Sequence, residues 1–244
     1  MRENVQLEGN AGRLAAHFYL PEGTPPFPAV VLCHGFTSCK DKYADIAEFL
    51  QGEGFAVLAY DCRGHGESEG GLDGQAWQDV GTALAYLQTR PEVDAGRLAL
   101  VGSSMGAHNG LRAAADYPVL RTVVAFNTAP GELLKLGLLS ADYWYAIQFM
   151  GGQVRVTLPD YLLYLEGEDI YDLPSRIRPR PIFFIHARDD PFIPYTVSER
   201  LQATASEDSR LWLLDSGGHS GPRHDPQVQR AVADWLREKL NLLT

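Results

Sequence analysis

Apolar runs of strand length alternate with helix-forming segments along most of this 244-residue chain, and this alternation restricts the fold more than any other feature. The apolar runs are AVVLCHG at 29–35, FAVLAYD at 55–61, RLALVG at 97–102, TVVAFN at 122–127, PIFFIHA at 181–187 and RLWLLD at 210–215. Apolar residues recur at helical spacing over 41–53, 76–88, 104–115, 196–205 and 226–240. Continuous apolar strands are typical of sheets buried on both faces. The sequence therefore predicts an α/β fold, with a mainly parallel, doubly wound sheet and right-handed crossovers.

Two parts of the chain depart from this alternation. VQLEG at 5–9 and RLAAHFYL at 13–20 flank the turn-forming GNAG, so we expect an opening antiparallel hairpin. From 131 to 177 the alternation stops, and the segment is rich in aromatic residues and broken by glycines. We expect it to form a small cap inserted over the sheet. The sequence has no internal repeat, low-complexity tract or linker, which predicts a single domain over 1–244 with the cap within it.

Charge and composition exclude several classes of function. The formal net charge is −10 and no cluster of Lys and Arg stands out, which argues against nucleic-acid binding. The three cysteines show no CxxC spacing, so we expect neither a disulfide framework nor a zinc site, and Cys33 is expected to pack in its apolar run. The acidic stretch EGED at 166–169 is expected to be solvated surface. No apolar run reaches the length of a membrane span and no signal core is present, so we expect no membrane insertion and a cytoplasmic location.

The pentapeptide GSSMG at 102–106 stands where a predicted strand meets a predicted helix. In that context GxSxG indicates a nucleophile elbow, a strained turn that exposes the central Ser104 above the end of the sheet. Gly102 and Gly106 then stand where strand and helix approach too closely for a Cβ atom. The backbone NH of Met105 would face a developing oxyanion. A chance turn of small residues gives the same pattern, so the interpretation depends on partners for the serine.

A serine hydroxyl is a weak nucleophile near neutral pH and needs a base within hydrogen-bond reach, together with a carboxylate that orients the base. In a parallel sheet these groups belong at the carboxyl ends of strands. RDDPFIP follows one predicted strand and supplies Asp189 and Asp190, and SGGHS follows the next and supplies His219. The chain order is Ser, Asp, His, which is the order found in α/β hydrolases.

Four segments together resemble the α/β-hydrolase family. They are HGF at 34–36, DCRGHGES at 61–68, the GSSMG elbow, and HARDDPFIP at 186–194 with GGHS at 217–220. The chain is similar to small cytoplasmic serine esterases, among them cinnamoyl-esterase-like, S33-type and lysophospholipase-like members. HGFTSCKD at 34–41 is similar to the HGFTGNKD of the cinnamoyl-esterase-like group. The resemblance covers almost the whole chain and implies an α/β-hydrolase fold.

The resemblance also implies roles for particular residues. Ser104 matches the nucleophile, His219 the base and Asp190 the acid. The backbone NH groups of Phe36 and Met105 match the oxyanion hole. The resemblance implies no metal and no organic cofactor.

Two alternatives stay open at the proposed triad. Asp189 is the alternative acid, because Ala187 stands where the family usually has glycine and the local turn is affected. His224 is the alternative base, although its place at a predicted helix start favours a capping or solvated histidine.

The remaining histidines and the RGHG loop are expected to be structural. His34 is expected to support the oxyanion loop through hydrogen bonds, and Arg63 and His65 to stabilise a loop near the elbow. The other histidines are His17 and His186, both in predicted strands and expected to be structural, and His108, which receives no role.

These features predict ester hydrolysis through an acyl-enzyme on a small-molecule substrate. The 131–177 segment would select the substrate, with short acyl, aromatic or monoacylglycerol-type esters expected. The candidate lining residues are Trp144, Phe149, Tyr161 and Tyr164. An amidase or aminopeptidase acting through the same triad is one alternative, and a non-catalytic protein that binds a small ligand is another. The oligomeric state is open between monomer and homodimer.

Overall fold

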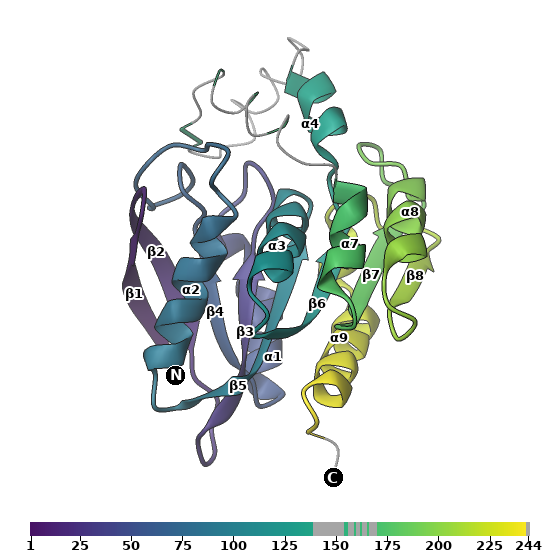
Figure 1. Cartoon of the computed structure of the whole chain (residues 1–244). Helices are drawn as coiled ribbons and strands as arrows, with labels where there is room; N and C mark the ends of the chain where they lie inside the picture. The colour runs from purple at the N-terminus through teal and green to yellow at the C-terminus, as the bar shows by residue number, and fades with distance from the viewer. Residues whose placement is uncertain (139–153, 156–158, 160–161, 163–164, 166–169, 243–244) are drawn as a thin grey trace.

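One sheet of eight strands, in the order β1-β2-β4-β3-β5-β6-β7-β8, runs through the computed structural model (Figure 1). The structure describes residues 1–138, 154–155, 159, 162, 165 and 170–242. The strands are β1 (Arg2–Gly9), β2 (Gly12–Tyr19), β3 (Phe27–Cys33), β4 (Ala56–Tyr60), β5 (Val93–Ser103), β6 (Leu120–Phe126), β7 (Ile182–Ala187) and β8 (Arg210–Leu214). β2 pairs antiparallel with both β1 and β4, and every later pairing is parallel. The predicted opening hairpin and parallel sheet are confirmed.

Helices cover both faces of this sheet. The α-helices are α1 (Ala44–Gly52), α2 (Gln78–Thr89), α3 (Met105–Asp116), α4 (Gly131–Leu138), α7 (Leu173–Ile177), α8 (Thr196–Thr204) and α9 (Pro226–Lys239). Short 3-10 helices are η1 (Lys40–Tyr43), η2 (Ile170–Asp172) and η3 (Gly221–His224). Side chains of α1 and α9 share one core cluster, and side chains of α2, α3, α7 and α8 share the other. The predicted doubly wound α/β-hydrolase fold is therefore confirmed, with the predicted helix at 41–53 divided into η1 and α1.

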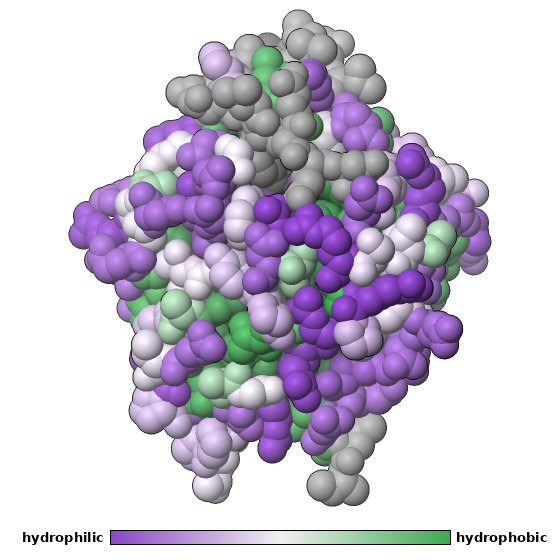
Figure 2. Space-filling model, in the orientation of Figure 1, coloured by the Kyte–Doolittle hydropathy of each residue, from purple (hydrophilic) through white to green (hydrophobic). Residues whose placement is uncertain are grey.

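The strands divide their side chains between these two clusters. In β3 every residue is buried: Val31 and Cys33 join the cluster under α2 and α3, while Val30 and Leu32 join the cluster under α1 and α9. Successive side chains of β3 therefore point to opposite faces of the sheet. Both sets are apolar because helices cover both faces. On the face that carries α2, α3 and α7, hydrophilic residues surround a hydrophobic area between α2 and α3 (Figure 2).

The predicted cap is described at its two ends and at residues 154–155, 159, 162 and 165 between them. α4 begins it and lies beyond the carboxyl ends of the central strands (Figure 1). η2 and α7 close it; α7 packs beside α3, and Ile170, Leu173 and Ile177 are buried in the core. The last eight residues of the 131–177 segment thus complete the crossover from β6 to β7. The candidate lining residues Trp144, Phe149, Tyr161 and Tyr164, and the EGED stretch, lie outside the described residues.

Helix lengths and hydropathy bear on membrane insertion. Across the described part of the chain, no helix combines the length and the apolar character that a membrane crossing requires.

Candidate active site

Ser104 lies in a sharp turn between β5 and α3. Its backbone has φ 55° and ψ −117°, a conformation that a non-glycine residue rarely adopts and that the surroundings must enforce. The Ser104 NH donates to the carbonyl oxygen of Phe126 at 2.9 Å, which fixes the turn against β6. A Cβ atom on Gly102 would come within 2.5 Å of the Gly106 carbonyl oxygen, and one on Gly106 would collide with the Cys33 carbonyl. The elbow has the geometry expected from the sequence.

Asp190 and His219 form a hydrogen-bonded pair after β7 and β8. Nδ1 of His219 lies 2.8 Å from Oδ2 of Asp190, whose side chain is fully buried. Oδ1 of Asp190 accepts from the backbone NH groups of Phe192 at 2.9 Å and Ile193 at 3.1 Å. The ring of Phe192 packs edge-on against the imidazole of His219, with 5.4 Å between ring centroids. The carboxylate therefore orients the imidazole and leaves Nε2 as its outer nitrogen.

The environment of Asp190 keeps its carboxyl ionised. Burial by itself raises the pKa of Asp190. Hydrogen bonds from His186, His219 and the Phe192 NH outweigh burial and hold that pKa well below its usual range. Asp190 thus carries a negative charge next to His219 throughout the neutral pH range.

The structure separates the two alternatives that the sequence left open. Asp189 is exposed and accepts from the backbone NH groups of Gly217 at 3.3 Å and Gly218 at 2.7 Å. It therefore stabilises the loop after β8 that carries His219, here called the histidine loop, from its solvent-exposed side. His224 lies in η3, where Nδ1 contacts the carboxylate of Asp45 in α1. The carboxylate hydrogen-bonded to His219 is that of Asp190.

Sequence reasoning missed Asn127, which follows β6. Its backbone has φ 43°, and its side chain is fully buried. The amide Nδ2 donates to Oδ2 of Asp190 at 2.6 Å and to the carbonyl oxygen of Gly218 at 3.2 Å. The Asn127 side chain therefore joins the end of β6 to the histidine loop and to the loop after β7 that carries Asp190. The end of β6 also anchors Ser104 through the Phe126 carbonyl oxygen. The only signal in the sequence was a polar residue at the carboxyl end of a predicted strand.

The loop after β3 approaches the elbow closely. Nε2 of His34 accepts from the Cys62 NH at 2.9 Å, so Nδ1 carries the proton and donates to the Gly35 carbonyl oxygen at 2.8 Å. Burial lowers the pKa of His34, which favours this neutral form. A Cβ atom on Gly35 would lie 3.4 Å from Cβ of Ser104. The predicted structural role of His34 is confirmed, and Gly35, directly before Phe36, lies beside the serine.

Met105 provides the second NH group predicted for an oxyanion hole. It is the first residue of α3, so its NH has no acceptor within the helix. The positive end of the helix dipole also lies at this position.

A buried ion pair between Lys40 and Asp61 anchors the loop after β3 to the loop after β4. The Lys40 NH donates to Oδ1 of Asp61 at 2.6 Å, and Nζ donates to Oδ2 at 2.9 Å. Both side chains are almost wholly buried. Each therefore neutralises the charge of the other, which would cost much free energy if it were buried alone. The pair joins the HGFTSCKD segment to the DCRGHGES segment.

Arg63 and His65, in the DCRGHGES segment, are buried rather than presented to solvent. Arg63 donates to Oδ1 of Asp79 through Nε at 2.9 Å and Nη2 at 2.6 Å. Nδ1 of His65 lies 3.2 Å from the Arg63 carbonyl oxygen, and burial lowers the pKa of His65 to about 3. The predicted structural role of this loop is confirmed.

The other histidines have partners within the fold. His17 contacts Asp41 at 2.7 Å, and Nδ1 of His108 lies 3.0 Å from the Ala129 carbonyl oxygen. His186 contacts the Ser198 hydroxyl at 2.8 Å, and its Nε2 lies 3.5 Å from Oδ2 of Asp190. His186 therefore supports the acid as well as β7.

A mainly parallel, doubly wound sheet with a strained serine after β5 and an Asp–His pair after β7 and β8 defines an α/β hydrolase. Within that class the chain belongs to the serine aminopeptidase, S33, family, whose model matches residues 24–146. The family and the fold together place the protein among the hydrolases.

Individual relatives match this chain over most of their length. The esterase YjfP of Escherichia coli is 27% identical over 233 residues, which cover 88% of this chain and 90% of YjfP. The α/β hydrolase GrgF from Penicillium sp. sh18 superimposes with a TM-score of 0.84 at 20% identity, covering 99% of both chains. Est1E from Butyrivibrio proteoclasticus, solved with ferulic acid bound, gives a TM-score of 0.81 at 19% identity over 97% of this chain and 99% of Est1E. At this identity the two structural likenesses show the fold.

Proposed function

We propose that the protein is a serine hydrolase that cleaves carboxylic esters through an acyl-enzyme. The observation that carries the proposal is the buried Asp190–His219 hydrogen bond, which Asn127 links to the strand end that anchors Ser104. An ionised carboxylate that orients a histidine, at the same edge of the sheet as a strained serine, is the arrangement that activates a hydroxyl nucleophile.

In the proposed reaction Oγ of Ser104 attacks the ester carbonyl carbon while Nε2 of His219 takes the hydroxyl proton. Asp190 stabilises the imidazolium that forms, and the NH groups of Phe36 and Met105 donate to the oxyanion. Collapse of the tetrahedral intermediate breaks the bond to the alkoxy oxygen, which leaves as an alcohol with the proton from His219. Water then attacks the acyl-enzyme by the same route and releases the acid. Each oxyanion donor is expected to lower the free energy of the transition state by about 3–4 kcal/mol.

Ester substrates are supported by the relatives. YjfP is named an esterase, and the Est1E structure holds ferulic acid, the acid half of a hydroxycinnamate ester. We propose short acyl, aromatic or monoacylglycerol-type esters as the substrate class. We also propose that the chain forms one domain, that the 131–177 segment acts as a cap over Ser104, and that Trp144, Phe149, Tyr161 and Tyr164 line the site.

The test compares Ser104→Ala with Ser103→Ala on p-nitrophenyl esters of increasing acyl length. Ser103 is the matched control, because it is a buried serine directly before Ser104, at the end of β5. We expect Ser104→Ala to lose ester hydrolysis and labelling by a fluorophosphonate, and Ser103→Ala to keep both. Full ester hydrolysis by Ser104→Ala would overturn the proposal.

The family description favours one second candidate, an aminopeptidase acting through the same residues. Aminoacyl anilides measured beside the esters distinguish the two: faster hydrolysis of the anilides would assign the protein to peptide bonds. A folded wild-type protein that never reacts with fluorophosphonate would instead indicate a non-catalytic ligand-binding role.

A further inference from the structure

β1 forms one edge of the sheet and is paired on one side only. The NH and carbonyl groups of Met1 both bond to Leu20, each at 2.9 Å, so Met1 and Leu20 form a hydrogen-bonded antiparallel pair. Because such pairs alternate along an antiparallel ladder, the odd-numbered residues of β1 direct their backbone groups to β2. Those of Arg2, Asn4, Gln6 and Glu8 therefore point outward from the sheet.

In the described part of the chain, this edge is a long, regular strand without a bulge or a proline. β1 pairs with β2 over all eight residues without a register shift, and it contains no proline. Natural edge strands are commonly short, bulged, interrupted by proline or covered. Glu3, which faces α2, is neutralised by Arg90 at 3.2 Å. The exposed charges of the strand are Arg2 near its start and Glu8 near its end, and they have opposite sign.

We propose that β1 pairs antiparallel with β1 of a second copy of this chain, with Val5 on the two-fold axis. The outward backbone groups of Arg2, Asn4, Gln6 and Glu8 then face those of Glu8, Gln6, Asn4 and Arg2 of the partner subunit. Arg2 of each copy lies opposite Glu8 of the partner subunit, so two cross-strand ion pairs form on one face. A shift by two residues would place Arg2 opposite Gln6 in one direction or Asn10 in the other and lose both ion pairs, which selects this register.

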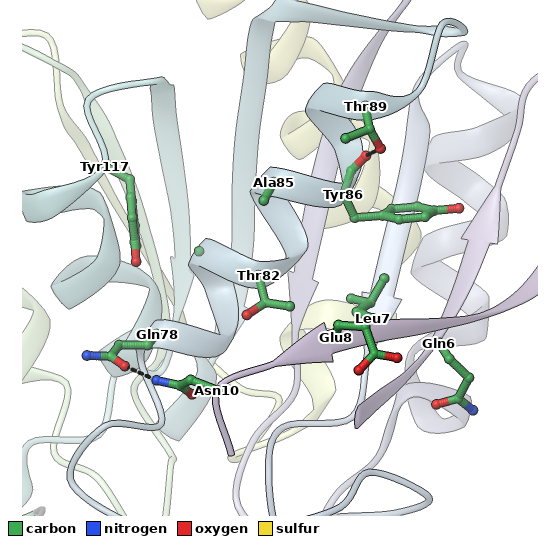
Figure 3. Close-up of a pocket in the computed structure, with 11 residues that line it drawn as sticks. Gln6, Leu7, Glu8, Asn10, Gln78, Thr82, Ala85, Tyr86, Thr89 and Tyr117 are labelled. Atoms are coloured by element: carbon green, nitrogen blue, oxygen red, sulfur yellow. Dashed lines mark hydrogen bonds between the residues drawn. The ribbon is translucent and has the colours of Figure 1, made fainter. Parts of the chain in front are cut away.

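A groove beside this edge fits the same partner. It has a volume of about 620 Å³ and runs between β1 and α2 (Figure 3). Of the described residues that line it, Glu8 alone is charged, although the chain carries a net charge of −10. Its α2 side presents Gln78, Thr82, Ala85 and Thr89. The two-fold operation places both α2 helices on the same side of the joined sheet, where these uncharged side chains let them approach without charge repulsion.

Sedimentation equilibrium with charge-exchange variants tests the proposal. Wild type is expected to be a dimer. Arg2→Glu places two glutamates opposite each other at both ends of the ladder, so its dissociation constant rises about tenfold or more. Glu8→Arg has the same effect through paired arginines. The double variant Arg2→Glu/Glu8→Arg restores the opposite charges and returns the dissociation constant to within about threefold of wild type.

Two further variants complete the design. Gln6→Pro removes one outward NH group per copy and is expected to weaken the dimer without disturbing the bonds to β2. Arg121→Glu is the matched control, since it reverses an exposed arginine on β6, away from this edge. A monomeric wild type, a dimer equally stable in Arg2→Glu and Arg121→Glu, or a double variant that stays dissociated would each overturn the proposal.

Discussion

Asn127 and His219 donate to the same oxygen of Asp190, at 2.6 Å and 2.8 Å respectively. Asn127 comes from the end of β6 and His219 from the loop after β8, so the carboxylate is held between two strand ends. The Asn127 amide also holds the Gly218 carbonyl, directly before His219. In the proposed enzyme Asn127 is therefore a positioning residue, acting through the acid and the histidine loop.

Asn127→Ala is expected to lower kcat about 10- to 100-fold with a small change in KM, because one hydrogen bond to a charged group is lost. Asn127→Asp adds a negative charge beside Asp190 and His219, so the acidic limb of the pH profile should move to higher pH. Thr128→Val is the matched control: among the described residues the buried Thr128 hydroxyl has no hydrogen-bond partner. Wild-type kcat and pH profile in both Asn127 variants would contradict the assignment.

Substitutions of the neighbouring residues Asp189 and Asp190 should differ sharply in their effect on activity. Asp190→Asn is expected to lower kcat about 1,000-fold or more, since the imidazole loses its orienting carboxylate. Asp189→Asn should cost less than about tenfold, because the amide oxygen can still accept from the Gly218 NH, the shorter of the two hydrogen bonds that Asp189 makes to this loop. Steady-state kinetics on one p-nitrophenyl ester checks both values. A larger loss in Asp189→Asn would make Asp189 the acid.

Stability should depend on pH through Asp190. Its pKa is lower in the folded protein than in the unfolded chain, so its ionisation stabilises the fold above the unfolded pKa of about 3.9. This contribution is lost as the pH falls through the folded pKa. Thermal unfolding of wild type and Asp190→Asn from pH 7 to pH 3 should therefore show a difference in Tm that is constant above about pH 5 and narrows below about pH 4. A difference that widens on acidification would refute this account.

The tight packing at the elbow predicts a strong effect of one methyl group. Gly106→Ala brings a Cβ atom onto the Cys33 carbonyl, so β3 and α3 must separate and the free energy of unfolding should fall by about 2 kcal/mol or more. Gly52→Ala is the control, because no atom lies within 4 Å of its added Cβ. That change should be neutral or stabilise by up to about 1 kcal/mol. Urea unfolding measures both, and equal stability of the two variants would disprove the packing argument.

The limits of sequence-based prediction are visible at the triad acid and at Asn127. Asp189 and Asp190 share one local context, so the sequence favoured Asp190 only through the family resemblance and left Asp189 as the alternative. The turn separates them, because the Asp190 NH bonds to the Ala187 carbonyl at 3.2 Å and its carboxylate meets the NH groups of Phe192 and Ile193. Asn127 was missed because its partners lie 63 and 91 residues further along the chain.

The sequence by itself determined the strand and helix order, the elbow at Ser104 and the family, because each of them follows from a local residue pattern or a short motif. Hydrophobic periodicity and glycine placement act over a few residues and can be inferred without a fold. Only the tertiary structure decided which aspartate meets His219, that Asn127 joins the end of β6 to two loops, and that β1 is an edge strand paired on one side within the described residues. These relationships depend on distances between segments remote in sequence, and such distances exist only once the sheet has assembled.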